Sequence, residues 1–155
     1  ESLLGLLEQS VLVKKNIVDT DPCEKSIRKS LNLGHTAGHA FESLALERKS
    51  PIPHGYAVAY GLVTELVLSH IKLGFSSEVL HRFAAYVKEV YGAFEFTCDD
   101  YSRLIALMRH DKKNLSAADI NFTLLRSIGD VQIDCVAGEE DIKTALDITR
   151  DLLGI

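Results

Sequence analysis

Apolar residues recur at helical spacing along most of this chain, three or four positions apart. One segment, INFTLLRSIGDVQIDCV, instead has strand character, and it predicts a short hairpin around Gly129. The pattern therefore predicts a mainly α fold class, with residues 1–155 forming a single compact multi-helix domain that carries one small β-hairpin. The helices that we predict cover residues 3–18, 34–47, 54–73, 76–92, 99–110 and 139–153.

Composition narrows the class of protein. Of 155 residues, 46% are hydrophobic and 25% are charged, a globular balance that indicates neither disorder nor a coiled coil. The net charge of -5, with scattered basic residues, argues against a nucleic-acid partner. The most apolar stretch, within 54–73, is interrupted by Glu65, Ser69, His70 and Lys72, so we interpret it as a buried helix and expect no membrane partner.

The cysteines and the start of the chain suggest a cellular setting. Cys23, Cys98 and Cys135 form no CxxC pair, which favours reduced, structural thiols in a cytoplasmic protein. The sequence lacks a signal-peptide pattern, does not begin with Met and opens like the middle of a helical region. We therefore expect it to be a piece of a longer protein.

The stretch LNLGHTAGHAFE places His35 and His39 one helical turn apart, with Glu42 on the same face. Two such imidazoles can chelate a metal, although the intervening Glu of HExxH enzymes is absent. Gly34 and Gly38 remove bulk beside both rings, which lets another backbone or a ligand approach at a cost in helix stability. The alternative is two surface or capped histidines without a metal.

Another histidine, His54, stands at the predicted start of the next helix, and a short helix–helix connection can bring it beside His35. A catalytic zinc usually takes three protein ligands, so these two histidines supply part of a site. The remaining histidines occupy ordinary helical patterns and are interpreted as structural or solvent-facing: His70, His81 and His110.

Two basic segments flank the histidine motif in an otherwise acidic chain. The first contains Lys14, Lys15, Arg28 and Lys29, and the second is RHDKKN at 109–114. Such segments suit a small, multiply anionic substrate, whereas the alternative is a solvated charged face. Glu24 is either a base or a surface charge.

In combination these motifs resemble one family. Lys14, Glu24, R-KSLN-LGHTAGHAFE, HGYAVAYG and DKKN, in this order, are similar to 3-dehydroquinate synthases. The resemblance implies the C-terminal, metal- and substrate-binding domain of that fold, with the N-terminal NAD-binding domain absent from this chain. It also implies cyclisation of 3-deoxy-arabino-heptulosonate 7-phosphate to 3-dehydroquinate, with phosphate release, in the shikimate pathway.

The resemblance also assigns roles to residues. His35 and His54 match metal ligands, and the third ligand, a Glu, is expected upstream of this chain. His39 matches a substrate contact implicated in proton transfer, and Glu24 matches a proton acceptor. The positions that match substrate-binding residues are Lys14, Arg28, Asn32 and either Lys112 or Lys113.

The implied cofactors are Zn²⁺ or Co²⁺, together with NAD held mainly by the absent domain. NAD would oxidise a substrate hydroxyl and recover its hydride after phosphate leaves, while the metal polarises two neighbouring oxygens. The implied partners are an anionic phosphorylated keto acid, the chain's own N-terminal domain and, for the parent protein, a second copy in a homodimer. This piece alone is expected to be inactive.

Two positions depart from the family pattern. Tyr56 replaces the usual Glu of HGEAVA, and Ser26 replaces a common glycine. Loss of a supporting carboxylate would retune metal affinity. The alternatives are another sugar-phosphate cyclase, of the 2-deoxy-scyllo-inosose or sedoheptulose-phosphate type, a metal-dependent alcohol or glycerol dehydrogenase, and a non-enzymatic helical interaction domain.

Overall fold

The computed structural model describes residues 2–110 and 119–155 of the chain. The predicted fold class is confirmed, because the described residues form mostly helices and one two-stranded antiparallel sheet. The α-helices are α1 (Leu3–Thr20), α2 (His35–Glu47), α3 (His54–Leu73), α4 (Ser77–Tyr91), α5 (Tyr101–His110) and α6 (Glu139–Leu153). The remaining elements are the 3₁₀ helices η1 (Ile27–Asn32) and η2 (Cys98–Asp100), and the strands β1 (Ile120–Ser127) and β2 (Asp130–Ala137).

Capping residues explain where the helices begin and end. The Ser76 side chain accepts a hydrogen bond from the Val79 backbone N–H and starts α4, and Gly74 ends α3 in the left-handed conformation. Strands β1 and β2 are joined by Ile128 and Gly129, and Gly129 has the positive φ of +85° that a two-residue hairpin turn favours.

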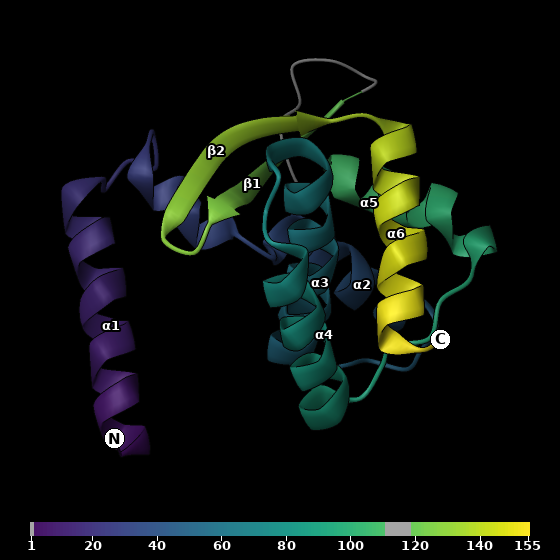
Figure 1. Cartoon of the computed structure of the whole chain (residues 1–155), viewed down its shortest axis with the longest axis horizontal. Helices are drawn as coiled ribbons and strands as arrows, with labels where there is room; N and C mark the ends of the chain where they lie inside the picture. Colours follow the sequence, from purple (N-terminus) through teal and green to yellow (C-terminus); the bar gives the residue numbers. More distant parts are fainter. Residues whose placement is uncertain (1, 111–118) are drawn as a thin grey trace.

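Helix α3 lies at the centre of the core, in contact with α2, α4, α6 and β1 (Figure 1). One face of α5 is buried, and its residues Tyr101, Leu104, Ile105 and Met108 are at most 6% exposed. The hairpin runs across one end of the helical body toward η1. The core is therefore built on α3, which also begins at His54.

Helix α1 stands to one side of this body and contacts η1 (Figure 1). None of its described residues is buried, although it carries seven large aliphatic side chains that are exposed. In contrast, η1 is fixed to the hairpin: the Thr123 hydroxyl donates to the Lys29 carbonyl oxygen at 2.9 Å, and the Lys29 ammonium pairs with Asp134 at 2.8 Å. Within residues 2–110 and 119–155, no helix is both long and apolar enough to cross a membrane.

Candidate metal and substrate site

The site begins with a close crossing of α2 and α3. A Cβ atom on Gly61 would lie 2.2 Å from the Gly34 carbonyl oxygen and 2.4 Å from the Gly38 nitrogen, so only glycine fits there. Gly34 also has a positive φ of +79°, and a Cβ on Gly38 would lie 3.1 Å from the Ala57 carbonyl oxygen. The glycines of the histidine motif therefore admit the backbone of α3, one of the two possibilities that the sequence left open.

This crossing brings three histidines together. The ring centroids of His35 and His39 are 5.4 Å apart, those of His35 and His54 are 5.6 Å apart, and those of His39 and His54 are 5.7 Å apart. His35 and His39 occupy successive turns of α2, whereas His54 is the first residue of α3. The predicted proximity of His54 and His35 is confirmed.

Hydrogen bonds orient two of these rings. The Nδ1 of His35 lies 3.0 Å from the Leu33 carbonyl oxygen, which can only accept, so this nitrogen carries the proton. The Nδ1 of His54 lies 3.2 Å from the Glu42 carboxylate and donates to it in the same way. In both rings the Nε2 then keeps a lone pair, as in metal-binding histidines, whose other nitrogen donates to a carbonyl or carboxylate.

The donor set therefore fits a divalent cation such as Zn²⁺ or Co²⁺, which accept imidazole nitrogens and carboxylate oxygens. Two ligand groups share this cluster. One is the predicted pair, His35 and His54; the other is His39, Glu42 and His54, whose ligand atoms all lie within 4.8 Å of one another. His54 belongs to both groups, and the ligand pair remains a prediction.

A loop before the histidines is organised by Asp21, a residue that the sequence did not single out. Its carboxylate accepts backbone N–H groups from Lys25 at 3.0 Å, Ser26 at 2.7 Å and Arg28 at 3.1 Å. These hydrogen bonds, led by that of Lys25, lower the pKa of Asp21 from 3.8 to about 2. The loop is therefore held by an ionised carboxylate at neutral pH.

Two of the predicted site residues in this loop, Glu24 and Asn32, contact each other. The Asn32 amide donates to the Glu24 carboxylate at 2.8 Å, and Glu24 has a positive φ of +54°. The Arg28 guanidinium donates to the Pro22 carbonyl oxygen at 2.8 Å, which sets its direction. Glu24 is exposed, and its role as a proton acceptor remains a prediction.

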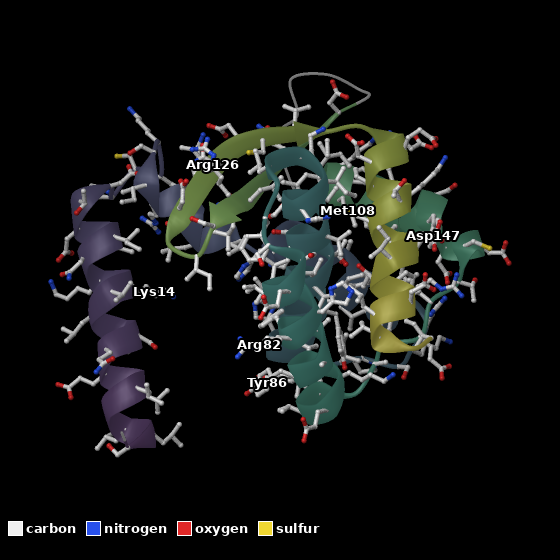
Figure 2. The ribbon with its side chains drawn as sticks, viewed as in Figure 1. Lys14, Arg82, Tyr86, Met108, Arg126 and Asp147 are labelled. Atoms are coloured by element: carbon white, nitrogen blue, oxygen red, sulfur yellow. The ribbon has the colours of Figure 1, made fainter. Side chains whose placement is uncertain are left out.

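The basic residues outside the loop are placed differently. Lys14 is exposed on α1 (Figure 2). Lys112 and Lys113 lie outside the described residues, so their roles remain predictions. The structure thus assembles the histidine cluster and the Glu24–Asn32 pair, and η1 leads directly from one to the other.

The two departures from the family pattern have local explanations. Tyr56 packs edge-on against Tyr91 of α4, with ring centroids 5.1 Å apart, and Tyr91 also contacts Tyr86, which Figure 2 shows on α4. Glu42, from α2, supplies the carboxylate beside His54. The Ser26 hydroxyl donates to the Asp21 carboxylate at 3.3 Å.

Two of the remaining histidines bond to backbone, as the structural interpretation predicted. The Nδ1 of His70 lies 2.7 Å from the Phe75 carbonyl oxygen, and that of His81 lies 2.7 Å from the Ser77 carbonyl oxygen. His110 is exposed at the end of α5. The three cysteines are free thiols, and burial raises the pKa of Cys135, which keeps that thiol protonated.

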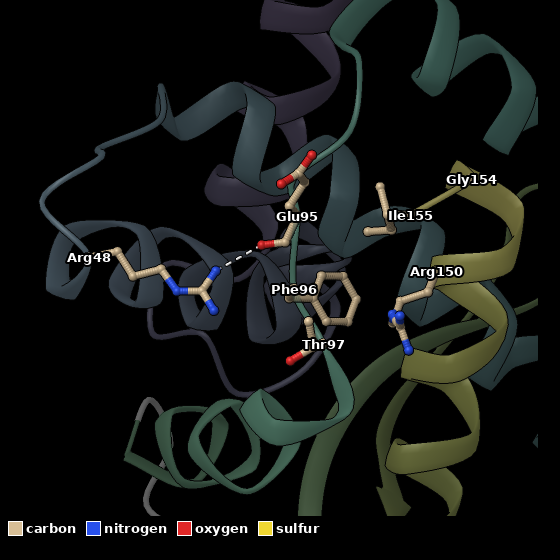
Figure 3. Close-up of a pocket in the computed structure, with 7 residues that line it drawn as sticks. All are labelled: Arg48, Glu95, Phe96, Thr97, Arg150, Gly154 and Ile155. Atoms are coloured by element: carbon tan, nitrogen blue, oxygen red, sulfur yellow. Dashed lines mark hydrogen bonds between the residues drawn. The ribbon is translucent and has the colours of Figure 1, made fainter.

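A separate cavity of about 440 Å³ lies near the end of α6 (Figure 3). Its lining includes Arg48, Phe96 and Arg150 but none of the three clustered histidines. The Arg48 guanidinium donates to the Glu95 carbonyl oxygen at 2.8 Å and to the Asp100 carboxylate at 2.6 Å. Since this arginine is engaged in holding the segment before α5, we place the site at the histidines.

Comparison with solved structures first defines the fold. A crystal structure of 2-deoxy-scyllo-inosose synthase complexed with carbaglucose-6-phosphate, NAD⁺ and Co²⁺ matches 77% of this chain and 34% of its own chain, with a TM-score of 0.57 and 20% identity. This chain therefore shares a fold with part of a sugar-phosphate cyclase.

Sequence comparison then defines the family. The family model "3-dehydroquinate synthase C-terminal" matches residues 1–114. A 3-dehydroquinate synthase of Parabacteroides distasonis is 52% identical over 153 residues, and one of Leptospira interrogans is 39% identical over 141 residues. These alignments cover 99% and 91% of this chain but only 43% and 38% of the relatives. The chain belongs to the 3-dehydroquinate synthase family, and it spans less than half the length of these relatives.

Proposed function

We propose that this chain is the metal- and substrate-binding part of a 3-dehydroquinate synthase. The observation that carries the proposal is the cluster of His35, His39 and His54 at the crossing of α2 and α3, in a chain whose first 114 residues match the family model. The proposed reaction converts 3-deoxy-arabino-heptulosonate 7-phosphate to 3-dehydroquinate, and it requires NAD held by a further domain.

We assign the metal to His35 and His54, with a third ligand from a part of the protein outside this chain. Support comes from the Nδ1 hydrogen bonds of both rings, which direct a lone pair on Nε2 away from their backbone and carboxylate acceptors. When bound, a Zn²⁺ or Co²⁺ ion would act as a Lewis acid toward substrate oxygens. Glu42 holds His54 in the tautomer that such binding needs.

The other residues of the site bind the substrate and move protons. His39 lies within 6 Å of both proposed ligand rings, close enough to exchange a proton with a substrate held at that point. Arg28 is fixed by Asp21 and Pro22, so its positive charge can orient an anionic group without first losing much side-chain freedom. Lys14 and one of Lys112 and Lys113 would add positive charge.

The first experiment measures metal binding by this chain. Titration with Co²⁺, followed by its visible absorption, is expected to show binding that weakens at least tenfold in His35→Ala and in His54→Ala. His81→Ala is the matched control, because His81 bonds only to the backbone of its own helix in the described contacts. Unchanged Co²⁺ affinity in either ligand variant would contradict the assignment.

The second experiment measures activity in the full-length protein that contains this chain. We expect NAD-dependent release of phosphate from the carboxylated heptulosonate phosphate and little release from glucose 6-phosphate or sedoheptulose 7-phosphate. The opposite preference would favour one of the other sugar-phosphate cyclases. The isolated chain should show no turnover with either substrate.

A further inference from the structure

A carboxylate that the proposed function does not use lies beneath the first turn of α2. Glu65 is 0% exposed in the middle of α3, between Thr64 and Leu66. Its carboxylate accepts the backbone N–H of Gly34 at 2.5 Å and that of Ala37 at 3.0 Å. A buried charge is costly unless it is hydrogen-bonded, so this residue has a defined structural task.

The structural role of Glu65 follows from the close crossing of α2 and α3 at their glycines. The first N–H groups of a helix lack partners within it, and Ser, Thr, Asp or Asn at the N-cap usually supplies one. The N-cap of α2 is Gly34, where the side chain of Leu62 and the positive φ exclude a larger residue. Gly34 has no side chain that could cap the helix. The carboxylate of Glu65 on the neighbouring helix α3 accepts the N–H groups instead.

The same carboxylate controls the surroundings of His35. The Gly34 N–H and the Leu33 carbonyl belong to one planar peptide group, so they point in opposite directions. Glu65 accepts the N–H side of this group, and the Nδ1 of His35 donates to its carbonyl side at 3.0 Å. The orientation of one peptide plane thus links a buried carboxylate to an imidazole of the site.

We propose that Glu65 is a positioning residue for His35: by fixing the Leu33–Gly34 peptide it holds the imidazole in the tautomer protonated at Nδ1, with the Nε2 lone pair directed into the histidine cluster. Glu65 acts on His35 through the Leu33–Gly34 peptide. The part of this inference that concerns metal affinity rests on the proposed function, whereas the part that concerns the tautomer does not.

The first test uses nuclear magnetic resonance on this chain without metal. Through-hydrogen-bond couplings are expected from the Gly34 and Ala37 amides to the Glu65 carboxyl carbon, and the ring ¹⁵N shifts of His35 should report protonation at Nδ1. These measurements need no substitution, so they test the geometry even if a variant fails to fold. Absence of both couplings would overturn the proposal.

The second test compares two variants with a core control. In Glu65→Gln the carboxamide oxygen can accept one N–H, but its NH₂ group cannot accept the other, and Glu65→Ala removes both acceptors. We expect the His35 ring shifts to move toward the mixture of tautomers of a free imidazole, further in the alanine variant. Leu68→Ala removes an apolar core side chain of the same helix and should leave the tautomer unchanged. A tautomer equally altered in Leu68→Ala, or unaltered in both Glu65 variants, would contradict a positioning role.

The third test separates this inference from the proposed function. In Co²⁺ titrations we expect affinity to fall about tenfold in Glu65→Gln, the size of loss usual when the partner of a metal ligand is removed. If the unaltered chain does not bind Co²⁺, the proposed function fails, while the tautomer measurement still decides the role of Glu65. If the chain binds Co²⁺ and Glu65→Gln binds equally well, Glu65 does not position a ligand.

Discussion

Glu42 lies on the same face of α2 as both histidines of the motif, and its carboxylate is 3.2 Å from the Nδ1 of His54. We expect Glu42→Ala to weaken Co²⁺ or Zn²⁺ binding by about 10- to 100-fold, because His54 loses the acceptor that fixes its ring. A competition titration with a chromophoric chelator measures this loss. Glu78→Ala, at an exposed glutamate of α4, serves as the control, and equal affinities in the two variants would exclude the role.

The lowered pKa of Asp21 predicts how the free energy of unfolding depends on pH. Its folded-state pKa of about 2 lies below the ordinary value of 3.8, so its contribution to stability is present above about pH 4 and is lost as the pH falls through about 2. Asp21→Asn should therefore be clearly less stable than the unaltered chain at pH 7, and the difference should shrink between about pH 4 and pH 2. Urea unfolding at several pH values measures this. A difference that stays constant with pH, or one reproduced by the exposed Asp151→Asn, would refute it.

Residues differ in how far the sequence alone identifies them. The proximity of His35, His39 and His54 could be predicted, because helical spacing and a short connection determine it. The tasks of Asp21 and Glu65 could not, because each depends on which backbone N–H groups the fold brings to it. A signal for Glu65 did exist: an acidic residue in an apolar helix needs a buried partner, and a helix that begins with glycine needs a cap.

At the scale of elements, the α2–α3 crossing gives a matched pair of substitutions on one helix. Gly61→Ala forces a methyl group into the backbone of α2 and should lower the free energy of unfolding by about 1–3 kcal/mol or more. Gly55→Ala meets nothing within 4 Å and should raise it by about 0.5–1 kcal/mol through helix propensity. Urea unfolding followed by circular dichroism measures both. Similar effects of the two substitutions would contradict the close crossing.

Most elements follow from local sequence. The predicted helix 139–153 agrees with α6, and the serine and glycine beside α4 mark its ends correctly. No helix was predicted between residues 18 and 34, and the short helix η1 was therefore missed. Its conformation depends on Asp21 and on contacts with the hairpin, and neither leaves a periodic pattern in the sequence.

At the scale of the whole molecule, α1 exposes aliphatic side chains on all sides, including Leu4 at 76% and Val11 at 66%. A helix that is hydrophobic all round is usually covered in the complete protein, and a large exposed apolar surface promotes association. We expect the isolated chain to self-associate as its concentration rises and the double variant Leu4→Lys, Val11→Lys to shift toward monomer. Sedimentation velocity measures this change. Lysines at Tyr86 and Val90, exposed on α4, provide the comparison.

The connection between η1 and the hairpin sets an order of events during folding. The three histidines lie within 20 residues of one another, so packing α2 against α3 closes only a short loop. In contrast, the Lys29–Asp134 ion pair joins residues 105 positions apart. Short loops close first, because the entropy lost on closure grows with loop length. On a ribosome, the cluster of His35, His39 and His54 can therefore form before the hairpin has been synthesised. The segment that carries Glu24, Arg28 and Asn32 gains its last anchor only when Asp134 emerges, so this segment is completed after the histidine cluster.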